Sequence, residues 1–360
     1  MTRLALVMIA RDEAKVIARA LDSARPYVDR MILLDTGSVD ATRDIAAACG
    51  AEVSEFAWCD DFSAARNAAL ALSDADWNLI LDADEWLEGG VEVLGPETLP
   101  AGGGGFLGAV RVRSLIDYPP GAAGQAWIPR VLPRGVDYRG RIHEQPASDL
   151  PQRRLALDIG HDGYSEENLA RKGERNEILM MRELEAAPQD PYLWLQMGKE
   201  HQARKHHPQA VLCFAEALRL APADAPYRHP LVVRTLTALR DNGQLEEALK
   251  FADAEVANWL ESPDFYLIVG YLYLDAAAQD PSRAREHFLP VAESAWRRCL
   301  EIGDRPDLEG SISGTGSYIA AQNLAVYHQN LGDPQTAAEF EALAERLRRE
   351  VQTPSAPPTA

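Results

Sequence analysis

The sequence of 360 residues predicts two folds in series: an α/β domain with a mostly parallel sheet, then an all-α domain of helical repeats. In the first part, short apolar runs alternate with amphipathic stretches, which is typical of a doubly wound sheet. After Tyr164 the chain becomes helical and self-similar, which is typical of repeat proteins. We therefore assign residues 1–165 to the first domain, 166–350 to the second and 351–360 to a disordered tail.

The elements of the first domain follow from the spacing of its apolar residues. Strands are predicted at 4–10, 30–35, 51–57 and 77–82, and helices at 12–24, 40–50 and 62–73. We interpret the irregular region that begins near residue 89 as strands and turns able to complete the sheet. Ligands bind beyond the carboxyl ends of parallel strands. Because Asp35, Asp82 and Asp84 fall at two such ends, we expect a function for them.

Overall charge and cysteine usage argue against several classes of protein. A formal net charge of −19 disfavours nonspecific attraction to nucleic acid or to an anionic membrane. The four cysteines are scattered, without C-x-x-C pairs or zinc-ligand spacing, which is typical of thiols in a reducing compartment. No apolar run approaches the length of a membrane helix, so we expect a cytoplasmic protein.

The Asp82-Ala83-Asp84 segment is the strongest candidate for chemistry. Residues two apart in a strand project to the same side, so both carboxylates can approach one site. Such oxygen ligands suit Mg²⁺ or Mn²⁺, which can bridge a diphosphate. A calcium-binding EF-hand would need Gly near Leu87 and Glu near Val93, and a D-x-D-x-T phosphatase would need Thr in place of Trp86. A nucleotide-sugar site remains.

Four separate motifs carry a family resemblance. They are MIARDE (8–13), LLDTGSVDAT (33–42), DDFSAARNAAL (60–70) and LILDADEWL (79–87). In order and spacing, residues 4–88 resemble a family 2 glycosyltransferase of the GT-A fold. The helical part is similar to that of bacterial members in which tetratricopeptide repeats follow the transferase domain.

This resemblance implies a site for the nucleotide of a sugar donor. The end of the first strand, with Ala10, Arg11 and Glu13, is expected to border the nucleotide. Asp35 is expected to contact the base or the ribose. Many relatives have two acids at this point, whereas this chain has Asp35 followed by Thr36.

The same resemblance implies roles at the diphosphate. Asp84 is expected to be the principal metal ligand, and Asp82 to contact the ribose or a metal-bound water. Arg66 is expected to bind phosphate, for which a guanidinium fork is well suited. The alternative for Arg66 is a salt bridge to Asp60 or Asp61.

Two further residues complete the expected site. Glu144, in RGRIHEQP, resembles the acid that lies across the cleft from the metal in repeat-bearing relatives, and is our candidate for the catalytic base. An ion pair with Arg139 or Arg141 is the alternative. His161 begins an H-x-G-Y element, and the resemblance implies that it completes the metal site. A structural role is the alternative for this histidine.

The helical domain fits a 34-residue repeat of two helices. Small or aromatic residues occupy the expected slots at Trp194, Gly198, Ala210, Phe214, Ala217 and Pro222. Looser copies follow, with Gly243 and Ala248 in register and with Gly270 and Tyr273 around an expanded turn. Such repeats present a concave surface to a peptide or protein.

The sequence thus predicts an inverting glycosyltransferase that depends on Mg²⁺ or Mn²⁺. Its expected partners are a nucleotide-diphosphate sugar and a glycan, lipopolysaccharide or protein acceptor, a protein docking on the repeats. One alternative is a scaffold protein whose transferase domain no longer catalyses. Another is a nucleotidyltransferase, but IARDEAKV lacks the Gly-rich, basic loop that this chemistry usually requires.

Overall fold

The computed structural model describes residues 2–115, 123–161 and 166–352, which form two compact units. The first unit contains Met1–Leu115 and Ala126–Pro188, and the second contains Ile116–Gln125 and Gln189–Ala360. The predicted disordered tail lies outside the described residues, except for its first two residues, which end the last helix.

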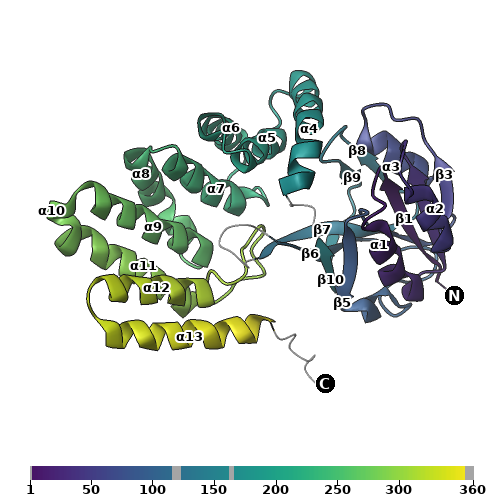
Figure 1. Ribbon diagram of the computed structural model, residues 1–360. Coiled ribbons are helices and arrows are strands. Elements are labelled where there is room, and N and C mark those ends of the chain that lie inside the picture. The colour runs from purple at the N-terminus through teal and green to yellow at the C-terminus, as the bar shows by residue number, and fades with distance from the viewer. Residues whose placement is uncertain (1, 116–122, 162–165, 353–360) are drawn as a thin grey trace. The chain divides into compact units, whose positions relative to one another are not determined.

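Eight strands of the first unit form one sheet in the order β3-β2-β1-β4-β7-β6-β10-β5 (Figure 1). They are β1 (Leu4–Ala10), β2 (Arg30–Asp35), β3 (Glu52–Glu55), β4 (Trp77–Ile80), β5 (Glu85–Gly89), β6 (Leu107–Leu115), β7 (Ala123–Pro133) and β10 (Gln152–His161). Strands β1 to β4 are parallel, whereas β7 runs antiparallel to β4, and β5 antiparallel to β10. The mostly parallel, GT-A-like sheet that the sequence predicts is therefore confirmed.

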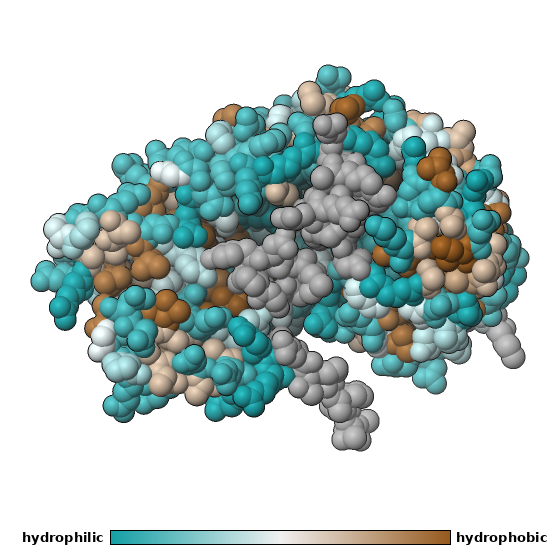
Figure 2. Space-filling view, in the orientation of Figure 1, coloured by the Kyte–Doolittle hydropathy of each residue, from teal (hydrophilic) through white to brown (hydrophobic). Residues whose placement is uncertain are grey.

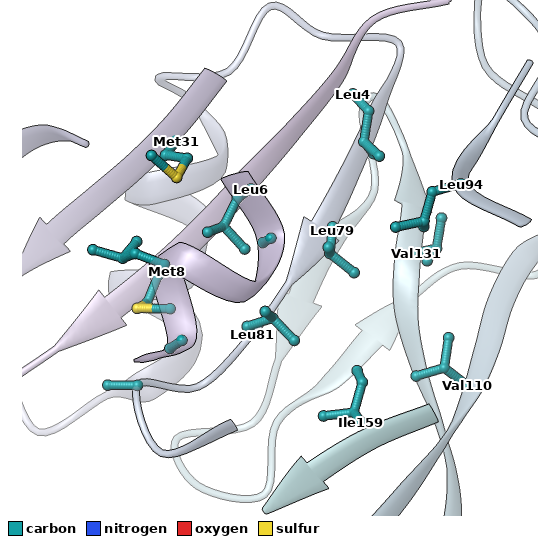
Figure 3. Close-up of a cluster of buried hydrophobic side chains, with 14 of the residues drawn as sticks. Leu4, Leu6, Met8, Met31, Leu79, Leu81, Leu94, Val110, Val131 and Ile159 are labelled. Atoms are coloured by element: carbon teal, nitrogen blue, oxygen red, sulfur yellow. The ribbon is translucent and has the colours of Figure 1, made fainter. Parts of the chain in front are cut away.

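Helices cover both faces of this sheet. The side chains of β1 point alternately to the two faces, and those on each face are packed in a buried cluster. Leu4, Leu6 and Met8 join one buried cluster, which includes Leu21 of α1 (Ile17–Ala24) (Figure 3). The odd-numbered residues of β1 join a second cluster with Ala69 of α3 (Phe62–Leu70). A two-residue period with both sides buried is typical of a central strand in a doubly wound sheet.

The predicted helix at 12–24 is shorter in the structure and starts only at Ile17. Asp12 has a φ of 56°, which an α-helix does not accept. Its backbone N–H donates to Ser38 Oγ, and the N–H of Glu13 donates to Thr42 Oγ1 at the start of α2 (Thr42–Ala48). The loop after β1 is thus tied to the loop after β2 instead of continuing into helix.

The irregular region after residue 89 completes the sheet through β6, β7 and β10. It also forms a separate antiparallel pair, β8 (Asp137–Arg139) and β9 (Gln145–Ala147). Helix α4 (Glu166–Ala186), which we counted with the repeats, belongs to the first unit. Arg182 of α4 pairs with Asp60 at 3.0 Å, which helps to hold this helix there.

The second unit consists of helical pairs, as predicted. Its helices are α5 (Pro191–Ala203), α6 (His207–Leu220), α7 (Arg228–Asp241), α8 (Leu245–Glu255), α9 (Pro263–Gln279), α10 (Pro281–Arg283), α11 (Leu289–Ile302), α12 (Tyr318–Asn330) and α13 (Pro334–Gln352). A Cβ on Gly198 would lie 2.4 Å from the ring of Phe214, and one on Gly270 would lie 2.2 Å from Trp296 Nε1. Close packing of the two helices in each pair therefore requires the glycines at these repeat positions.

Hydrophilic residues cover most of the face seen in Figure 2, and the hydrophobic ones form small separate patches. Across residues 2–115, 123–161 and 166–352, no helix combines the length and the apolar character needed to cross a bilayer.

Candidate active site

The carboxyl ends of β1 and β2 bring the expected nucleotide residues together, since Ala10 pairs with Asp35 in the parallel register. Asp35 is only 1% exposed, and its Oδ1 accepts hydrogen bonds from the N–H groups of Gly37 and Ser38, at 3.0 and 2.9 Å. The other oxygen, Oδ2, is buried and has no hydrogen-bond partner within the described parts of the chain. A buried acceptor without a partner is costly, so this atom is a candidate to bind a ligand donor.

The loop after β1 carries the other two expected nucleotide residues. Arg11 is exposed, and its Nε lies 3.9 Å from Asp12 Oδ2. Glu13 is held in place through its backbone, because its N–H donates to Thr42 Oγ1 at 2.8 Å. Arg11 and Glu13 therefore lie on an ordered loop beside the end of β2.

Asp84 lies on a tight turn directly after β4 and is 6% exposed. The turn is closed by a hydrogen bond from Glu85 N–H to the carbonyl oxygen of Asp82 at 3.0 Å. Strand β5 starts at Glu85 and pairs with β10 so that Glu85 lies opposite His161. This pairing explains why residues far apart in sequence meet here.

The structure brings together the two predicted metal ligands. His161 Nε2 lies 3.7 Å from Asp84 Oδ1, and His161 Nδ1 lies 2.9 Å from Ser114 Oγ. Burial alone would lower the pKa of His161, but the hydrogen bond and negative charge of Asp84 raise it above the usual value. The contact with Ser114 fixes the orientation of the imidazole ring.

The side-chain oxygens and nitrogens near Asp84 and His161 show whether a metal ion could bind there. In the described residues, no group of three or more His, Cys, Asp or Glu side chains is arranged to hold a metal ion. Asp84 and His161 nevertheless offer an oxygen and a nitrogen close enough to touch one ion, since Mg²⁺ lies about 2.1 Å from its ligands. The remaining ligands of such an ion would come from water and from the donor diphosphate, as Mg²⁺ commonly requires. The residues present fit a metal that binds together with the donor.

Asp82 lies between two guanidinium groups. Its Oδ1 accepts from Arg66 Nη2 at 2.6 Å and its Oδ2 accepts from Arg130 Nη2 at 2.8 Å. The same Nη2 of Arg130 donates to Glu85 Oε1 at 2.5 Å. Burial would raise the pKa of Asp82, but Arg130 and Arg66 outweigh it and hold that pKa well below its usual range. In Glu85 the effect of burial dominates and raises the pKa.

Arg66 also donates through Nε to Glu144 Oε1, so this arginine links the expected base to Asp82. Neither alternative partner predicted for Arg66 is used, since Asp61 caps α3 through Ala64 N–H at 2.9 Å and Asp60 pairs with Arg182. The ion pairs proposed for Glu144 with Arg139 or Arg141 are likewise not those observed.

Helix α3 positions Glu144 by holding the β8–β9 hairpin on both sides of Arg66. The amide of Asn67 exchanges two hydrogen bonds with the backbone of Tyr138, at 3.0 and 2.7 Å. Phe62 N–H donates to the carbonyl oxygen of Arg141 at 2.9 Å. Because these contacts fix the hairpin at two points, Glu144 is presented to Arg66, and both side chains are about nine-tenths buried.

The sequence reasoning missed Arg130, Glu85 and Asn67. Arg130 has a recognisable signal, because it is a single charge inside an otherwise apolar strand segment, IPRVL. Glu85 also has a signal, because it is the third acid of the LDADEW segment. Asn67 has no such signal, since its partner is a backbone group of a distant strand.

The mostly parallel sheet, with acids at the ends of β2 and β4, is GT-A-like. Residues 5–93 match the family model described as Glycosyl transferase family 2, so this segment is a domain of that family.

Two named relatives each match a stretch of the chain. A protein named TPR repeat-containing protein, from Synechococcus elongatus, is 52% identical over 87 residues, covering 24% of this chain and 22% of its own length. The SPbeta prophage-derived glycosyltransferase SunS of Bacillus subtilis is 28% identical over 204 residues, covering 54% of this chain and 48% of its own. The chain thus spans about a fifth to about half of these relatives.

Two solved structures align with separate parts of the chain. MamA from Desulfovibrio magneticus is 21% identical, with a TM-score of 0.39, over 52% of this chain and 93% of its own. Glucosyl-3-phosphoglycerate synthase from Mycobacterium tuberculosis is 27% identical, with a TM-score of 0.25, over 31% of this chain and 43% of its own. With scores this low, neither alignment bears on function.

Proposed function

We propose that this protein is a metal-dependent, inverting glycosyltransferase that moves a sugar from a nucleotide-diphosphate sugar to a hydroxyl-bearing acceptor. The observation that carries this proposal is the convergence of Asp84, His161, Arg66 and Glu144 beyond the end of β4. A family 2 glycosyltransferase domain at residues 5–93 supports the same reaction.

The donor would bind along the ends of β1, β2 and β4. The unpartnered Oδ2 of Asp35 is suited to accept a hydrogen bond from the base or ribose, beside Ala10, Arg11 and Glu13. Arg66 would bind the diphosphate. Asp84 and His161 would hold Mg²⁺ or Mn²⁺, which stabilises the negative charge on the departing nucleoside diphosphate. Asp82, whose side chain is 34% exposed beside Arg66 and Arg130, would contact the ribose or a metal-bound water.

Glu144 would act as the base. It would accept the proton of the acceptor hydroxyl while that oxygen bonds to the anomeric carbon and the bond from this carbon to the diphosphate breaks. Attack opposite the leaving group inverts the anomeric configuration. Before the donor binds, Arg66 holds Glu144; the donor diphosphate competes for this arginine and so releases the base.

The repeats would bind the acceptor or a protein that carries it. The acceptor bound in this way would be a peptide, a protein, a glycan or a lipopolysaccharide. A cytoplasmic location and a hexose as the transferred sugar also stay predictions.

The experiment that tests the proposal measures nucleoside diphosphate release from a panel of sugar nucleotides, with Mn²⁺, Mg²⁺ or a chelator. We expect slow hydrolysis of one donor by the wild type, lost with chelator and in Asp84→Asn. Absence of both release and donor binding in the wild type would contradict the proposal and favour the scaffold alternative. Binding without release would call for a search among acceptors.

A further inference from the structure

We propose that Arg130 is a positioning residue which, together with Glu85, braces the turn from Asp82 to Glu85 so that Asp84 faces His161. This inference rests on the proposed function, since it concerns the same metal and donor site. Arg130 lies on β7, outside the segment 5–93 that matches the glycosyltransferase family.

A closed ring of contacts surrounds the turn. Glu85 N–H donates to the Asp82 carbonyl oxygen at 3.0 Å, and Asp82 N–H donates to Glu85 Oε2 at 2.9 Å. Arg130 then joins the other carboxylate oxygen of Glu85, at 2.5 Å, to Asp82 Oδ2, at 2.8 Å. The turn backbone and both flanking side chains are therefore fixed together, with Asp84 inside the fixed segment.

Strand pairing explains why Arg130 reaches this turn. Strand β7 runs antiparallel to β4, with Leu79 opposite Val131. Arg130, which precedes Val131 in β7, therefore lies beside Ile80, the last residue of β4, just before the turn. Both Arg130 and Glu85 are buried, at 7% and 2% exposed, so their pair is shielded from screening by solvent.

If Arg130 only stabilised the fold, its buried N–H groups should all have hydrogen-bond partners. Nε of Arg130 is buried and has no hydrogen-bond partner in the described part of the protein. Its Nη2 is shared between two acids instead. Leaving a buried donor unsatisfied costs stability, so this geometry favours contact with the turn over satisfaction of the guanidinium. By contrast, Arg111 on β6 forms two hydrogen bonds with Asp158, at 2.6 and 2.7 Å.

The test compares Arg130→Met, Arg130→Lys and Glu85→Gln with Arg111→Met, which removes an ion pair elsewhere in the same sheet. Glutamine at position 85 keeps an acceptor for Asp82 N–H but turns an amide toward Arg130. For each protein, calorimetry measures Mn²⁺ binding in the presence of uridine diphosphate, or of the nucleoside diphosphate released in the donor panel. Donor KM, kcat and thermal unfolding are measured in parallel.

We expect Arg130→Met to weaken Mn²⁺ binding by about tenfold or more, the effect typical of lost support for a ligand. Lysine has one compact charge and cannot bridge both acids, so Arg130→Lys should be intermediate. In a double variant that carries Glu85→Gln as well, Arg130→Met should reduce Mn²⁺ affinity much less, because Glu85→Gln has already opened the ring of contacts. Arg111→Met should bind Mn²⁺ as the wild type does, even where its unfolding temperature falls.

Three outcomes would overturn the inference. One is wild-type Mn²⁺ binding in Arg130→Met. Another is an equal loss in Arg111→Met, which would indicate general weakening of the sheet. If Arg130→Met fails to fold, wild-type binding in both Arg130→Lys and Glu85→Gln has the same meaning. A wild type that binds neither metal nor any donor contradicts the proposed function itself, and this inference with it.

Discussion

Two acids, one in each unit, differ in exposure and in partners, and the Asp82 side chain is 34% exposed. Asp82 in the transferase unit lies between Arg66 and Arg130, at 2.6 and 2.8 Å, and its pKa is well below the usual value. Asp264 in the helical unit is 3% exposed, and its Oδ1 accepts from Ile312 N–H at 2.9 Å. Burial raises the pKa of Asp264 to about 7, because no arginine or lysine of the described chain pairs with it.

The difference shows that nearby cations decide whether such a carboxyl group is ionised. Asp264 belongs to a hydrogen-bonded junction that attaches the segment around Ile312 to the start of α9. Hydrogen-bond donors are sufficient for this structural role. Asp82 is kept ionised by two cations beside further acids, an arrangement that a ligand's charge can rearrange. Variants in each unit test this contrast.

The largest effect is expected for Glu144→Gln. Glutamine keeps the shape of the side chain but cannot accept a proton, so nucleoside diphosphate release with water as acceptor should fall by about 10²- to 10⁴-fold. Donor affinity, measured by calorimetry, should rise modestly, because glutamine competes with the diphosphate for Arg66 less strongly than a carboxylate does. The matched control is Glu183→Gln, since Glu183 pairs with Arg141 of the same hairpin at 3.2 Å. Equal rates in Glu144→Gln and wild type would exclude Glu144 as the base.

In the helical unit, Asp264→Asn should change how stability depends on pH. With its pKa raised to about 7, folded Asp264 holds a proton that the unfolded chain has released above pH of about 4, so stability falls as the pH rises toward 7. The loss is on the order of a few kcal/mol. Asparagine cannot ionise but still accepts from Ile312 N–H.

The measurement is the unfolding temperature of both proteins between pH 5 and 8, and the variant should lose less across this range. His229, whose Nε2 lies 3.8 Å from Asp264 Oδ2, has a pKa that burial lowers below its usual value, and it is present in both proteins. Parallel curves would show that Asp264 is ionised when folded and would remove the contrast with Asp82.

The sequence predicts those parts of the fold and site that depend on nearby residues. Apolar runs locate β1, β2 and β4, and the acids after them lie at the sheet edge because parallel strands end together. Gly198 and Phe214 are recognisable because one repeat contains both. The sequence also predicts that the chain becomes helical after Tyr164, but the unit to which α4 belongs depends on contacts between residues distant in sequence.

Partners distant in sequence were not predictable. Arg66 and Glu144 are 78 residues apart, and Arg130 and Glu85 are 45 apart. Which of several acids each arginine meets depends on the order and register of β4, β7 and the β8–β9 hairpin, which local patterns do not specify. For this reason the ion-pair partners considered as alternatives for Arg66 and Glu144 are not those observed, whereas their expected roles in the site stay predictions.

The smallest effect concerns packing alone. A methyl group in Gly198→Ala would lie 2.4 Å from the Phe214 ring, so α5 and α6 must separate, at a cost of about 1–3 kcal/mol. In the control Gly105→Ala the added methyl meets no atom within 4 Å, and stability should not change. Calorimetric unfolding and Mn²⁺ binding are measured on both variants.

If the two units unfold independently, Gly198→Ala lowers only the unfolding temperature of the helical unit and leaves metal binding intact. A single transition that shifts as a whole would instead show that the transferase unit depends on the repeats for its stability.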